Sequence, residues 1–178
     1  MLAYLFTLLA VVVHARILPF PWHFTPVAAA LLFFGARGSR RQIWLPWVLL
    51  VIADIYLNRF VYAYPLSWDQ TVIWAWYAAI LWLGTRLGKN AKPLPIIGAA
   101  LGSSISFFLI SNFMVWATGT MYPRTWAGLL TCYDAGVPFF RPTLEGDLLF
   151  TAAMFATPAV IRAISEAFGK MGDHSAAA

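Results

Sequence analysis

Long apolar stretches separated by short polar or proline-rich connections make up most of this chain. They predict helices over residues 2–18, 25–36, 44–60, 71–87, 96–117 and 144–164. A helix needs about 20 residues to cross the hydrocarbon core of a bilayer. Within the second stretch, the helix over residues 26–36 covers only about 16 Å at the helical rise, so it is either a short tilted span or a half-membrane segment. The pattern therefore predicts an all-α membrane protein with about six transmembrane helices in one bundle.

This bundle accounts for nearly the whole chain. Residues 1–168 are interpreted as one transmembrane domain, and residues 169–178 as a frayed cytoplasmic tail. No Lys or Arg precedes the first apolar run, as it would in a signal peptide, so we expect a retained first helix. The longest polar connection covers residues 118–143. We expect the outer end of the fifth helix and this connection to contribute most of any small-molecule site.

Composition supports the membrane interpretation. The chain is 61% apolar and 11% charged, with a mean hydropathy of +0.73. Soluble domains carry about 25% charged residues, so this chain is not one of them. The net charge of +5 does not indicate nucleic-acid binding, because the basic residues lie at helix ends. The single Cys132 excludes an intrachain disulfide.

The distribution of basic residues predicts the topology. With six spans, eight of the twelve Lys and Arg residues fall on one side and four on the other. Short cytoplasmic loops carry the excess of positive charge, so both termini are expected in the cytoplasm of a multi-pass cell (inner) membrane protein. The larger group is Arg37, Arg40, Arg41, Arg86, Lys89, Lys92, Arg162 and Lys170, and the smaller is Arg16, Arg59, Arg124 and Arg141.

Asp54 is the first candidate binding residue. It lies ten residues into its helix, near mid-membrane, where a lone carboxylate costs about 2.5–3.5 kcal/mol on insertion scales. Asn58 lies one turn farther on, on the same face. The two side chains form either the polar wall of an outward pocket or an interhelical hydrogen bond that fixes packing. The sequence favours neither.

A second candidate group lies where the fifth helix ends. Asn112 and Trp116 share a face of that helix, and Tyr122 and Arg124 follow in the connection. Aromatic rings with a few hydrogen-bonding groups are typical of small-molecule pockets. The alternative is an interfacial belt of Trp and Tyr, which the 17% aromatic content favours.

The remaining polar and small residues indicate structural roles. Gly98, Gly102 and Ser106 form a small-residue ridge that suits close helix packing, within the bundle or against a partner protein. Arg141 and Glu145 are spaced to form an ion pair. Glu145 and Asp147 are expected in the first turn of the last helix, where acids complement the helix dipole.

No motif indicates catalysis, a metal or a cofactor. The chain has no HExxH, glycine-rich phosphate loop, GxSxG or CxxC. His14 and His23 are nine residues apart across prolines, which is not a recognised metal-ligand spacing. We therefore expect a non-enzymatic protein with no metal site.

Five segments resemble a family of six-helix bacterial membrane proteins: residues 21–36, 50–54, 112–116, 122–129 and 138–147. That family in turn is remotely similar to the substrate-binding S components of energy-coupling-factor vitamin transporters. The resemblance implies that Asp54, Asn112, Trp116, Tyr122 and Arg124 line or cover a vitamin pocket near the outer face. It also implies a transmembrane coupling subunit driven by two ATPases. The Ala-x-x-x-Ala surface usual on helix one of S components is absent here.

Two functions from different classes follow. The first is a substrate-binding membrane subunit for uptake of a vitamin-like small molecule, with ATP hydrolysed by partner subunits. The second is a structural or assembly subunit of a larger membrane complex, with no ligand of its own. A cavity that reaches Asp54 favours the first function, and an Asp54 paired within a sealed bundle favours the second.

Overall fold

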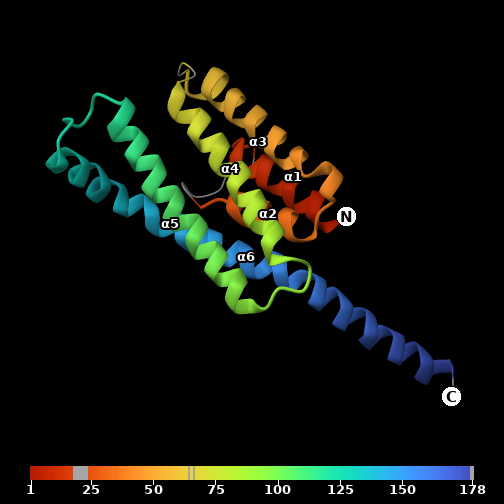
Figure 1. The fold of residues 1–178 in the computed structure, drawn as a ribbon. Helices are drawn as coiled ribbons and strands as arrows, with labels where there is room; N and C mark the ends of the chain where they lie inside the picture. Colours follow the sequence, from red (N-terminus) through yellow and green to blue (C-terminus); the bar gives the residue numbers. More distant parts are fainter. Residues whose placement is uncertain (18–23, 64, 66, 177–178) are drawn as a thin grey trace.

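The computed structural model describes residues 1–178 except 18–23, 64, 66 and 177–178, with the side chains of 169–176 also left undescribed. The described residues form α-helices and short helical turns, without strands, which confirms the all-α prediction (Figure 1). The six α-helices are α1 (Leu2–His14), α2 (Val27–Arg37), α3 (Trp44–Tyr56), α4 (Trp68–Leu87), α5 (Pro93–Thr118) and α6 (Trp126–Ala176). A 3-10 turn, η1 (Arg40–Gln42), precedes α3, and a π-helix, η2 (Leu57–Val61), follows it.

Helix length and composition agree with a membrane protein. Within the described residues, three helical segments are long and apolar enough to cross a bilayer: Arg40–Val61, Pro93–Thr118 and Trp126–Phe168. α1 and α2 are apolar but shorter. α1 ends at His14, four residues before the predicted end at residue 18, which itself lies outside the described residues.

The short helix α2 lies at the centre of the bundle. Every residue from Val27 to Ala36 is buried, and α1, α4, α5 and α6 pack around it. A helix that is apolar on all faces is either enclosed by other helices or exposed to lipid, and the contacts of α2 show that it is enclosed. α1 contributes a stripe of small buried residues, Ala3, Thr7 and Ala10. The stretch that looked too short to span thus forms the core.

α2 and α4 cross with their backbones in contact. A Cβ atom on Gly35 would lie 2.3 Å from the carbonyl oxygen of Leu81 and 2.8 Å from the Cα of Gly84. A Cβ on Gly84 would lie 2.4 Å from the Leu32 carbonyl oxygen. Small residues let membrane helices approach this closely and gain dispersion contacts, since lipid gives little hydrophobic drive for helix association.

The connection after α5 is much shorter than predicted. α6 begins at Trp126, so only residues 119–125 separate it from α5, and it continues to Ala176 through the expected loop and tail. Pro138, Pro142 and Pro158 lie inside this helix. α6 packs along α5. The Cys132 thiol donates to the Asn112 carbonyl at 3.3 Å, and the Tyr133 hydroxyl donates to the Leu109 carbonyl at 2.9 Å.

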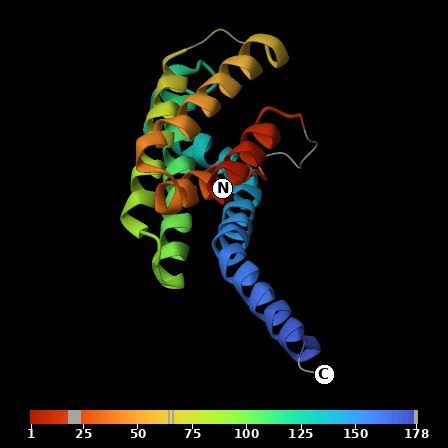
Figure 2. The same cartoon turned by 90° about the vertical axis from the view of Figure 1, so that its right-hand side faces the viewer.

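This difference has a physical cause. Proline removes one backbone hydrogen bond and usually ends a helix in water. At membrane depth an unwound segment would leave more backbone groups unpaired, so the helix continues. Beyond the bundle, residues 159–168 are all exposed, and Figures 1 and 2 show this part of α6 extending away from the other helices.

The predicted glycine ridge does not pack within this chain. A Cβ on Gly98 or Gly102 would meet no atom within 4 Å. Ala99, Ala100, Ser103 and Ser104, on the other face of α5, are buried instead. Ser106 is the ridge member that makes a contact, since its hydroxyl accepts from Trp76 Nε1 at 2.9 Å. α5 is apolar on all sides, so its sequence alone did not reveal which face turns inward.

Gly35→Ala should lower the free energy of unfolding by several kcal/mol, because the new methyl group must push apart two packed backbones. Gly98→Ala is the matched control, a helical glycine with open space around it, and it should be neutral or stabilising by about 0.5–1 kcal/mol. Thermal unfolding in detergent, followed by circular dichroism, compares the two variants. Equal melting points would contradict the close crossing.

Candidate functional site

A cavity lined by polar side chains, called here the main cavity, lies where α1 and α3 end and α4 begins. Its volume is about 340 Å³, within the range of small-molecule sites. α1 contributes His14, the segment before α2 contributes Thr25, and α5 and α6 contribute Phe107 and Thr143. α3, η2 and α4 supply most of the remaining wall. The other lining residues are Val13, Arg16, Asp54, Leu57, Asn58, Tyr62, Asp69, Gln70, Ile73 and Tyr77.

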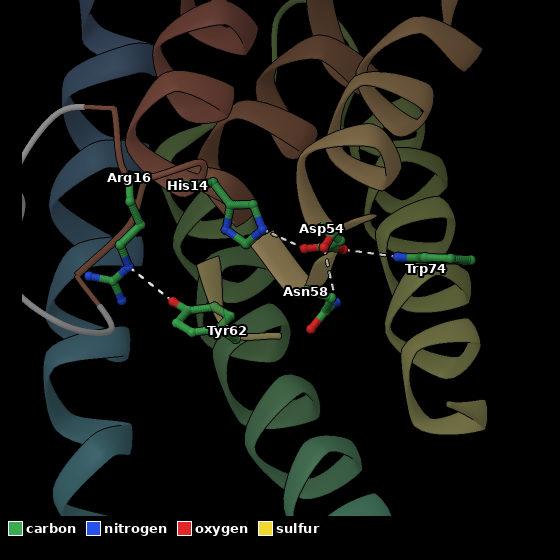
Figure 3. A network of polar contacts seen from close by, with 6 residues as sticks. All are labelled: His14, Arg16, Asp54, Asn58, Tyr62 and Trp74. Carbon is green, nitrogen blue, oxygen red and sulfur yellow. Dashed lines mark hydrogen bonds and ion pairs between the residues drawn. The ribbon is translucent and has the colours of Figure 1, made fainter. Parts of the chain in front are cut away.

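Asp54 holds three helices together at this cavity (Figure 3). His14 Nε2, at the end of α1, lies 2.6 Å from Asp54 Oδ1. Trp74 Nε1, in α4, donates to Asp54 Oδ2 at 2.9 Å. A carboxylate offers only acceptors, so Nε2 of His14 carries the hydrogen in this contact. Each carboxylate oxygen therefore has a partner from a different helix, which offsets the cost of placing the charge in the bundle.

Irregular backbone surrounds the same cavity. Asn58 lies in η2, where the Tyr62 N–H bonds the Leu57 carbonyl five residues back at 2.8 Å. Arg16 and Ala63 have φ of 60° and 54°, in the left-handed region that non-glycine residues rarely adopt. The Arg16 Nε donates to the Tyr62 hydroxyl at 3.2 Å (Figure 3). π-helical turns and strained backbone concentrate at functional sites, and here both lie beside one cavity.

Two amide side chains of this lining, Gln70 and Asn58, have hydrogen-bonding capacity that the described residues leave unused. The buried Oε1 atom of Gln70 has no hydrogen-bond partner among them. Asn58 Nδ2 donates to the Asp54 carbonyl, four residues back, at 2.9 Å. Tyr77 and Phe107 add aromatic surface. A compact molecule with both polar groups and an apolar ring suits this lining.

The structure brings only some of the sequence-predicted residues together. Asp54 and Asn58 line the main cavity. Asn112 lines a neighbouring cavity of about 210 Å³ between α5 and α6, which shares Phe107 and Thr143 with the first. Gly136 lies against the Asn112 side chain, where a Cβ would meet Oδ1 at 2.4 Å.

The aromatic and basic residues of the connection form a separate cluster. Trp116 lies nine residues beyond Phe107, about 14 Å farther along α5 at the helical rise. Its Nε1 donates to the Pro123 carbonyl at 2.9 Å, and the Arg124 guanidinium lies 5.7 Å from its ring centroid. Arg124 also donates to the Gly119 carbonyl at 2.8 Å. With Tyr122, these residues shape the α5–α6 turn and do not line the main cavity.

The acidic residues of α6 have different roles from those expected. Arg141 Nε donates to Glu145 Oε1 at 2.8 Å on the exposed surface, which confirms that pair. The helix-dipole interpretation of Glu145 and Asp147 is wrong, because α6 begins at Trp126 and both lie mid-helix. Asp147 is buried, and its Oδ2 accepts from the Ser104 hydroxyl at 2.6 Å.

Sequence reasoning missed several residues of this site. The sequence analysis weighed His14 only as a metal ligand together with His23 and rejected that spacing, so its contact with Asp54 was not predicted. His23 lies outside the described residues. Trp74 and Gln70 carried no distinguishing signal in an aromatic-rich helix. His14 did carry one, as a polar residue ending an apolar helix opposite the helix that holds Asp54.

A comparison with protein-family models places the chain. The match covers residues 1–168, and therefore every element that lines the cavity. The chain belongs to DUF6580, a family of unknown function. No curated protein and no solved structure matches it. For this DUF6580 member, functional inference depends on the geometry of the site.

Asp54→Ala should lower the free energy of unfolding by about 1–2 kcal/mol, because His14 Nε2 and Trp74 Nε1 lose their acceptor. Asp54→Asn should cost less, since its amide oxygen can still accept one bond. Asp134→Ala, which removes an exposed carboxylate from α6, is the control and should be neutral. Thermal unfolding in detergent measures all three. If Asp54→Ala unfolds at the wild-type temperature, the three-helix network does not stabilise the bundle.

Proposed function

We propose that this protein is a non-enzymatic membrane subunit that captures a vitamin-like small molecule for uptake, in the manner of the S components of energy-coupling-factor transporters. The observation that carries the proposal is the cavity of about 340 Å³ at Asp54. It is built from six helices or their flanks, lined by polar side chains, and surrounded by strained backbone. A subunit whose only role is assembly has no need for these features.

The position of the cavity supports capture from outside. It lies at the ends of the bundle where α1 and α3 finish and α4 starts. The basic segments around η1 and between α4 and α5 lie at the other ends of these helices. Positive charge in short loops favours the cytoplasm, so the cavity faces outward in this proposal. Arg16, hydrogen-bonded to Tyr62, is then part of the entrance.

Uptake against a gradient requires an energy source, and we propose a transmembrane coupling subunit with two ATPases. The small-residue stripe of α1 is buried against α2 and is therefore not offered to such a partner. Gly98 and Gly102 expose a small-residue face of α5 with no neighbour in this chain. Their outward position supports α5 as the surface for a partner helix.

The same outward glycines favour the alternative, an assembly subunit without a ligand. In that case the Asp54 network serves only to fix packing, and its partners in α1 and α4 are sufficient for that role. The two proposals differ in one property. Only the substrate-binding subunit gains stability from a small molecule that enters the cavity.

A thermal-shift screen of the purified protein in detergent against water-soluble vitamins and their precursors tests this difference. A ligand present at about 100 times its dissociation constant should stabilise the protein by roughly 2.7 kcal/mol. Gln70→Leu should abolish that stabilisation and leave the unliganded melting point unchanged, because the lost Oε1 atom has no hydrogen-bond partner among the described residues. Asp54→Ala is less suitable, since it also disturbs packing.

The control is Gln42→Leu, at the far end of α1 from the cavity, where Gln42 accepts from the Tyr4 hydroxyl. It should retain the ligand-induced shift. If a ligand raises the melting point of Gln70→Leu as much as that of the wild type, the ligand binds elsewhere and the proposed site is contradicted. A screen that also includes nucleobases, amino acids and amines but yields no hit favours the assembly subunit.

A further inference from the structure

A smaller compartment of about 60 Å³ adjoins the main cavity on the side of α6. The two share five lining residues: His14, Thr25, Tyr77, Phe107 and Thr143. The first residues of α2, Val27 and Ala28, line only the smaller one, as do Trp76 and Asp147. The two cavities therefore adjoin one another along these five residues.

Among the described residues, Asp147 is the only acidic one that lines the smaller compartment. It is 4% exposed, and Ser104 is its hydrogen-bond donor, at 2.6 Å. Among the described residues, no Lys, Arg or His lies within ion-pair distance of it; the ion pairs found there are His14–Asp54 and Arg141–Glu145. A carboxylate at membrane depth normally pairs with a cation or marks a functional pathway.

The helix dipole does not replace a cation. The N-terminus of α2 borders the compartment and carries roughly half a positive charge. That partial charge is less than the full counter-charge that a buried carboxylate needs. The compartment can therefore accept a positively charged group beside Asp147.

Aromatic side chains form much of the remaining wall. Trp76, Tyr77 and Phe107 all line the compartment, and the ring centroids of Trp76 and Phe107 are 5.0 Å apart. Aromatic faces attract organic cations through their quadrupole, and rings grouped around a carboxylate are the usual means of recognising alkylammonium groups. Asp147 is not part of any group of three or more His, Cys, Asp or Glu that could hold a metal ion, since the described residues contain no such group.

We propose that the compartment at Asp147 is the subsite for a protonated amine, so that the ligand is a small organic ammonium compound whose remaining part occupies the main cavity. This rests on the proposed function, because it assumes that the main cavity binds a ligand. Asp147 is the counter-charge, and Trp76, Tyr77 and Phe107 surround the alkyl groups next to the nitrogen. Asp54 and its partners contact the polar remainder.

Calorimetric titration of the detergent-solubilised protein with methylammonium and trimethylammonium tests the subsite directly. Each should bind saturably, while tert-butyl alcohol, which is similar in shape to trimethylammonium but uncharged, should not. Asp147→Asn retains the size of the side chain and a polar partner for Ser104, and it should weaken binding on the order of tenfold or more. Phe107→Leu should weaken it about two- to fivefold.

Glu145→Gln is the matched control. It removes an exposed carboxylate two residues from Asp147 on the same helix and should leave ammonium binding unchanged. Potassium chloride at equal ionic strength should not compete. Competition by potassium would show a metal-ion site and overturn the proposal.

Two results separate this inference from the proposed function. A neutral or anionic ligand whose stabilisation is lost in Gln70→Leu and retained in Asp147→Asn would overturn the ammonium subsite and leave the capture function standing. Absence of saturable alkylammonium binding to the wild-type protein would also overturn it, because a preformed subsite must bind the isolated group. Alkylammonium binding with no hit in the vitamin screen supports the subsite and removes vitamins as the ligand.

Discussion

The backbone contact between α2 and α4 at Gly35 and Gly84 is the constraint on which the rest of the bundle depends. α2 is too short to reach across a bilayer, and it is buried along its whole apolar length. The surrounding helices must therefore enclose it and converge around it. They are longer than α2 and extend past its N-terminus, where the described residues place no central helix between them. Two adjoining cavities lie there, lined by Thr25 before α2 and by Val27 and Ala28 in its first turn.

Helix ends determine which side chains enter that space. His14 is the last residue of α1, and Asp54 lies one turn before α3 changes to the π-helix η2. The π-helical turn changes the angular position of the residues after it relative to a regular helix, and Asn58 and Tyr62 lie on the cavity as a result. Arg16 keeps a left-handed backbone, which costs about 1–2 kcal/mol, and from there its side chain reaches Tyr62. The site is therefore built from places where the helices stop being regular.

Sequence reasoning succeeded where a physical signal is local. Apolar runs identified the helical segments, and the spacing of Arg141 and Glu145 identified their pair. The mid-helix position of Asp54 correctly marked a polar centre in the bundle. Sequence reasoning failed where the structure depends on neighbouring helices. The prolines within α6 predicted a loop, but α6 continues through them beside α5, and that packing cannot be inferred from the sequence of α6 alone. The sequence also left open whether the ridge at Gly98 faces the bundle or a partner, since an apolar helix has no polar face to show which side turns outward.

The bundle treats two carboxylates differently: Asp54, which is half-buried, and Asp147, which is buried. Both oxygens of Asp54 have nitrogen donors from other helices, so its contacts serve packing even while it lines a cavity. The two roles left open by the sequence are thus compatible for this residue. Asp147 has a neutral serine as its donor and no cation among the described residues. If both acids served only packing, Asp147 would stabilise the bundle less than an apolar residue in its place, because the apolar residue would avoid the cost of desolvating a carboxylate. The imbalance is understandable if the missing positive charge arrives with a ligand.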